Sequence, residues 1–60
     1  MKMYTVKIMI ATPREIKSIQ NKLCMDLWEG VRVNTKKLAE SIAIKAYNIE
    51  PFVDIEIIED

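Results

Sequence analysis

The chain has no histidine, one cysteine and one glycine among its 60 residues. The single cysteine, Cys24, excludes an internal disulfide, and without histidine a dedicated zinc or iron site is not expected. A histidine-based catalytic triad and a glycine-rich phosphate loop are also excluded, so we expect neither an enzyme nor a cofactor-binding protein. An unpaired cysteine is typical of a reducing compartment and favours a cytoplasmic location.

Long apolar runs are missing too. The run IMIA at residues 8–11 is far shorter than the core of a signal peptide (about 7–15 residues) or a membrane helix (about 18 or more), so no membrane association is expected. A domain of this length buries only about 60% of the surface of its unfolded chain. Half of the residues are apolar, and without a covalent staple a homodimer is the expected way to cover them.

Alternating apolar residues predict a strand over residues 3–10. One face of this strand holds Tyr4, Val6, Ile8 and Ile10. Thr12, Pro13 and Glu15 then form a capping-box pattern, which predicts a helix over residues 13–28. Its buried stripe comprises Ile16, Ile19, Leu23 and Leu27, with Cys24 beside it.

A second helix is predicted from Asn34 or Thr35 to the residues before Pro51. Its buried stripe comprises Leu38, Ala39, Ile42, Ala43, Ala46 and Ile49. Residues 31–33 follow Gly30 and are interpreted as a loop rather than a short strand. In the closing segment 52–58 the period-2 pattern returns, with Val53, Ile55 and Ile57 opposite Asp54 and Glu56, and it predicts a second strand.

This order of elements resembles the ribbon-helix-helix family, and Arc-type repressors in particular. The resemblance covers residues 3–48 and is carried by Pro13-Arg14-Glu15-Ile16 and by Gly30 followed by Val33-Asn34-Thr35. It implies an α+β fold in which residues 1–50 form an intertwined homodimer and residues 51–60 add an acidic C-terminal strand or tail. It also implies a small transcriptional regulator, a repressor, whose antiparallel β-ribbon enters the major groove of double-stranded DNA.

Two sets of residues are the candidate DNA contacts. Thr5, Lys7 and Met9 share the strand face that the resemblance turns toward the bases, although a merely solvated face is the alternative. The candidate phosphate contacts at the start of the second helix are Asn34, Thr35, Lys36 and Lys37. The two lysines also have Glu40 as an alternative partner.

Charge is divided along the chain. Residues 1–45 hold all nine basic residues and four acids, whereas residues 46–60 hold five acids and no base. Since the net charge is zero, phosphate binding would depend on the first part. The last acids, interpreted as a solvated strand edge or tail rather than a catalytic or cation site, are Asp54, Glu56, Glu59 and Asp60. In a regulator, residues 51–60 would bind a protein partner.

A different arrangement stays open: a β-α-α-β module in which residues 52–58 pair with residues 3–10 of the same chain. Thr5 and Lys7 would then face Asp54 and Glu56 across the strands, and the module would bind a protein, as an inhibitor or antitoxin does, without binding DNA. The position of residues 52–58 distinguishes the two arrangements.

Three further side chains have open roles. Trp28 either covers the small core or anchors an interface. Cys24 is expected to be buried. Met3 and Met9, on the outer face of the strand, suggest that protein or DNA covers that face.

Overall fold

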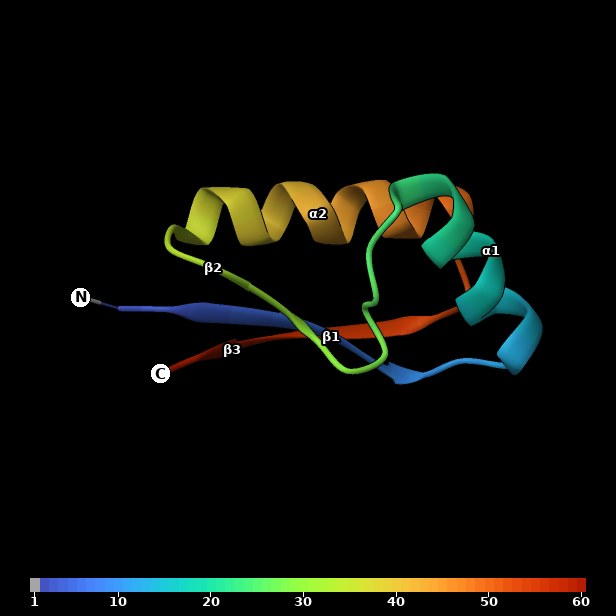
Figure 1. The fold of residues 1–60 in the computed structure, drawn as a ribbon, viewed down its shortest axis with the longest axis horizontal. Helices are drawn as coiled ribbons and strands as arrows, with labels where there is room; N and C mark the ends of the chain where they lie inside the picture. Colours follow the sequence, from blue (N-terminus) through green and yellow to red (C-terminus); the bar gives the residue numbers. More distant parts are fainter. Residues whose placement is uncertain (1) are drawn as a thin grey trace.

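Three strands and two helices make up residues 2–60, the part of the chain that the computed structural model describes (Figure 1). In chain order they are β1 (Tyr4–Ile10), α1 (Pro13–Leu23), β2 (Val31–Val33), α2 (Lys36–Ile49) and β3 (Asp54–Glu59). The strands form one antiparallel sheet in the order β2-β1-β3. Both helices lie on the same side of this sheet, with α2 running lengthwise along it. Within this described part, neither helix is long and apolar enough to cross a membrane.

β1 is the central strand of the sheet. The strands predicted at residues 3–10 and 52–58 are confirmed as β1 and β3, and they pair with each other. The interpretation of residues 31–33 as a loop was wrong, because they form β2 against Tyr4–Val6. Gly30, at φ 107°, turns the chain so that Val31 and Val33 both pack on the core.

The pairing of β3 with β1 answers the question of arrangement. The chain has the β-α-α-β order of the second alternative, with β2 added at the other edge. Lys7 lies opposite Glu56 as expected, but Thr5 lies opposite Ile58 and not Asp54. The antiparallel direction of the strands causes this difference: Thr5 lies two residues before Lys7, so its partner lies two residues after Glu56, whereas the pair Thr5–Asp54 would need parallel strands.

Both edges of β1 are therefore occupied by strands of its own chain. The ribbon that the family resemblance implies needs β1 to pair with a second β1, and no free edge is left for it. The intertwined homodimer would require β2 or β3 to leave β1, and it stays a prediction.

The predicted start of α1 is confirmed. The backbone N–H of Thr12 donates to Glu15 Oε1 at 2.9 Å, and the backbone N–H of Glu15 donates to Thr12 Oγ1 at 3.3 Å. These reciprocal bonds satisfy two backbone donors that the first turn of a helix otherwise leaves free.

The predicted end of α1 at residue 28 was wrong. The helix stops at Leu23 because Cys24 adopts the left-handed conformation, with φ 54° and ψ 37°. Cys24 is also exposed, contrary to expectation. Leu27 is buried nonetheless, because the loop returns to the sheet and Leu27 C=O accepts from Ile8 N–H at 2.9 Å.

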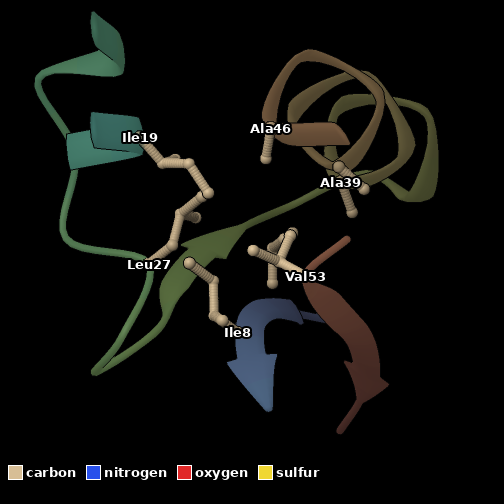
Figure 2. Close-up of a cluster of buried hydrophobic side chains, with 8 residues drawn as sticks. Ile8, Ile19, Leu27, Ala39, Ala46 and Val53 are labelled. Atoms are coloured by element: carbon tan, nitrogen blue, oxygen red, sulfur yellow. The ribbon is translucent and has the colours of Figure 1, made fainter. Parts of the chain in front are cut away.

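The core lies between the sheet and the helices (Figure 2). Its buried residues are Val6, Ile8, Ile19, Leu27, Ala39, Ala43, Ala46 and Val53. Three alanines on one side of α2 let that helix approach the sheet closely. Leu38, expected in the buried stripe, is 51% exposed because the line of contact follows these alanines instead.

Candidate functional site

The face of the sheet that points away from the helices carries the candidate base contacts. Thr5 and Lys7 alternate with the buried residues of β1 and so lie on this face. Glu56 of β3 lies directly opposite Lys7. A phosphate that approached Lys7 would therefore also approach a carboxylate.

Met9, the third candidate, lies in the bulge of β1 and is 44% exposed. The register places Asp54 opposite the next residue, Ile10. This end of the open face is thus apolar and acidic, a mixture that does not suit a DNA backbone.

The candidate phosphate contacts open α2 on the other side of the sheet. Thr35 is the N-cap and its Oγ1 accepts from Leu38 N–H at 3.2 Å. Lys36 and Lys37 are exposed. Neither lysine forms an ion pair with Glu40 among the described residues, where the two ion pairs are Lys2–Glu59 and Arg32–Asp60.

The acidic C-terminal end lies close to two other basic residues, Lys2 and Arg32. Lys2 Nζ is 2.8 Å from Glu59 Oε1, and Arg32 Nη2 is 2.8 Å from Asp60 Oδ2. The hydrogen bond to Lys2, with its charge, lowers the pKa of Glu59, and Lys36 lowers it slightly further. The same contact raises the pKa of Lys2. The structure thus places the acidic end of the chain beside Lys2 and Arg32. The candidate base contacts and the candidate phosphate contacts lie on opposite sides of the sheet.

A hollowed surface adjoins Trp28. Its indole is 48% exposed and lines two open hollows of about 590 Å³ and about 520 Å³. The first is completed by Ala11, Pro13, Ile16, Lys17, Gln20 and Asp26, and the second by Lys7, Ile8, Met9 and Glu29. We call the two hollows together the Trp28 groove.

The loop after α1 holds Trp28 in this position. The carboxylate oxygen Oδ1 of Asp26 accepts from Gln20 Nε2 at 2.7 Å, from Trp28 N–H at 3.1 Å and from Glu29 N–H at 3.4 Å. Leu27, between them, points into the core. Because one residue of the turn is buried and the backbone of the next is tied to Asp26, the indole is directed outward by a fixed turn.

The lining of the groove is partly apolar and partly charged. Pro13, Ile16 and Met9 supply apolar surface beside Trp28. The charged lining residues, which we call the rim, are Lys7, Lys17, Asp26 and Glu29. Of the groups proposed from sequence, it uses Lys7, Met9 and Trp28. The role of Asp26 was missed. Aspartate side chains often accept a hydrogen bond from the backbone N–H two residues later, as Asp26 does from Trp28, so this residue type was a turn signal.

No catalytic chemistry is apparent in this groove. Its polar groups are amines, carboxylates and an amide, without a paired nucleophile and base. Among residues 2–60, no three His, Cys, Asp or Glu side chains are grouped to hold a metal ion.

Comparison of the chain with family models, curated proteins and solved structures gives no match. A function is therefore inferred from the geometry of this surface.

Proposed function

We propose that the protein is a small interaction module that binds an apolar segment of a partner protein in the Trp28 groove. The observation that carries the proposal is a half-exposed tryptophan, fixed by Asp26 between two hollows. Tryptophan and methionine are enriched at protein interfaces, and a central aromatic residue often contributes most of the binding energy.

The shape of the groove favours a protein over a small molecule. Both hollows are open to solvent, whereas a site for a small ligand encloses most of its ligand. The rim indicates what the partner presents: an acid toward Lys7 or Lys17, a base toward Asp26 or Glu29, and an apolar side chain between them. Such charged rims contribute more to specificity than to affinity.

The DNA-binding regulator is the rival proposal. It would use Thr5, Lys7 and Met9, but β1 has neighbours on both edges and Glu56 lies beside Lys7. Base readout from this face would have to overcome the repulsion between phosphates and the acids of β3. We therefore favour the protein-binding module.

The test is a partner captured by crosslinking and then measured in purified form. A photoreactive residue at Lys17 should trap the partner in cells. Calorimetry should then show that Trp28→Ala weakens binding at least 30-fold, as expected for a residue contributing about 2 kcal/mol or more. Trp28 is the single tryptophan of the chain, so its emission should shift when the wild-type groove is covered.

Leu38→Ala is the matched control. Leu38 is 51% exposed, close to the value for Trp28, but lines neither hollow. Its truncation should change the affinity less than about twofold. Equal effects of the two substitutions would show that the groove is not the binding site. A duplex that is enriched from random DNA, and whose binding is lost in Lys7→Ala, would favour the regulator.

A further inference from the structure

The outer edge of β3 is the second feature with an unassigned role. In an antiparallel strand, successive residues direct their backbone N–H and C=O alternately to one edge and the other. Ile8 N–H donates to Leu27 C=O, on the β2 side of β1, so its partner Ile55 directs its own groups away from β1. Asp60 N–H donates to Met3 C=O, which agrees with this alternation.

Tyr47 of α2 occupies the edge at Ile55. Its hydroxyl accepts from Ile55 N–H at 3.1 Å and donates to Ile55 C=O at 3.4 Å. One side chain thus replaces both backbone groups that a neighbouring strand would supply. The same alternation directs the backbone groups of Ile57 and Glu59 outward, where no residue of 2–60 pairs with them.

The side chains along this edge are acidic. Glu59 and Asp60 are engaged by Lys2 and Arg32, but Asp54 and Glu56 form no ion pair among the described residues. Ile58 lies on the same face as Glu56 and is 40% exposed.

We propose that the outer edge of β3, from Ile57 to Glu59, adds an extended segment of a partner protein that carries lysine or arginine at alternate positions. Backbone groups supply the affinity in such strand addition, and flanking side chains select the sequence. A basic segment that pairs at Ile57 and Glu59 places a cation beside Glu56, which forms no ion pair among the described residues. A second copy of this chain fits less well, because two adjacent β3 strands would bring six carboxylates, three from each copy, to one seam.

Tyr47 limits the length of this edge. An added strand can pair at Ile57 and Glu59 while Tyr47 holds Ile55, but it must displace the hydroxyl to extend further. Tyr47 therefore determines where pairing with an added strand stops. This site lies on the opposite edge of β1 from the Trp28 groove and does not depend on the function proposed for that groove.

The experiment uses the full chain and a blocked seven-residue peptide of alternating valine and lysine. At saturating peptide, amide exchange at Ile57 and Glu59 should slow at least tenfold, whereas Glu56 and Ile58, which face β1, should not change. A peptide with glutamate in place of lysine should give no protection. Two further peptides carry methyl groups on the backbone nitrogens of one edge or of the other. The peptide whose methyl groups point away from β3 should bind, and the other should not.

Two variants test the assignment further. Tyr47→Phe frees the backbone of Ile55, so protection should extend to Ile55 and binding should tighten about 2- to 10-fold, the net contribution of one hydrogen bond. Glu56→Lys should weaken binding of the lysine peptide, whereas Glu40→Lys, an exposed acid of α2, should not.

Several outcomes would overturn the proposal. Unchanged exchange at Ile57 and Glu59, equal protection by the lysine and glutamate peptides, or equal binding of both N-methylated peptides would each do so. Protection that rises with protein concentration alone would assign the edge to a second copy. A shift of Trp28 emission without protection of β3 would place the peptide in the groove instead.

Discussion

Single side chains determine where this chain changes direction. Thr12 and Glu15 start α1, Asp26 shapes the loop that follows, and Gly30 turns the chain into β2. Cys24 ends α1 in a left-handed conformation that residues other than glycine rarely adopt. The fold thus depends on a few positions with narrow requirements.

Thr12→Ala tests the start of α1. Losing the N-cap hydroxyl should lower the free energy of unfolding by about 1 kcal/mol, measured by urea denaturation. Arg14→Ala, an exposed neighbour outside the capping box, should change it by less than about 0.5 kcal/mol. Equal losses in the two variants would show that the box does not stabilise the helix.

The same substitution should change a titration. The Thr12 backbone N–H, and to a smaller extent its hydroxyl, lower the pKa of Glu15 below its ordinary 4.5. The ionised carboxylate therefore stabilises the fold above pH 4.5, and this stabilisation is lost as the pH falls through the lowered pKa. In Thr12→Ala the pKa, followed by NMR, should rise but stay below 4.5, because the backbone bond remains. An unchanged pKa would contradict the hydroxyl contact.

Gly30→Ala tests the entry to β2. Gly30 has φ 107°, and an added Cβ would lie 2.8 Å from Thr5 Cγ2. We expect a loss of about 1–3 kcal/mol in unfolding free energy. Adding Thr5→Ser removes the clashing methyl and should restore part of the loss, whereas Glu29→Ala should cost less than about 0.5 kcal/mol. Wild-type stability of Gly30→Ala would mean that the chain does not turn in this way.

Elements were predictable from the sequence where the signal was local. The period-2 pattern of β1 and the capping residues Thr12 and Thr35 depend only on near neighbours. The pattern and Thr12 were recognised, and Thr35 was one of two candidate caps beside Asn34. The end of α1 was not, because Leu23 and Leu27 keep helical spacing although the chain leaves the helix between them. β2 was missed because three residues after a glycine carry too little pattern. The Trp28 groove was not predictable, since it exists only when the loop folds back onto β1.

The role of β3 can be tested by truncation after Glu50. β3 borders β1 along most of its length, and the truncated segment also carries Val53, which is buried in the core. We expect the shortened chain to lose its dispersed amide NMR spectrum. Removal of Asp60 alone should cost less than about 1 kcal/mol, because it breaks an exposed ion pair and one terminal backbone bond. A folded chain of residues 1–50 would instead support the division that the family resemblance implies, with residues 51–60 as a tail.

Across the whole molecule, basic and acidic residues are separated along the sequence but lie side by side in the folded chain. The acidic last residues lie beside the basic first ones, so the two regions of opposite charge meet across β1 and β3. This arrangement lowers the positive field that the first part of the chain would otherwise present to a nucleic acid. Large apolar side chains outside the Trp28 groove are also exposed, among them Leu38, Ile44 and Phe52.

Because these apolar residues are exposed, we still expect the chain to form a homodimer. A core of this size gains stability from association, so the melting temperature should rise with protein concentration. Sedimentation equilibrium at micromolar concentrations should give twice the mass of the 7.0 kDa chain. A monomer with a concentration-independent melting temperature would refute the expectation, while leaving both proposed binding surfaces available.

The central position of β1 has a consequence for biosynthesis. β1 is translated before its neighbour β3, and at ordinary elongation rates the delay is roughly 2–9 s. The nascent chain therefore carries an alternating apolar segment with an unfilled edge until β3 has been translated. The sheet is completed only when β3 has left the ribosome, and during that interval β1 must be kept from pairing with another newly made chain.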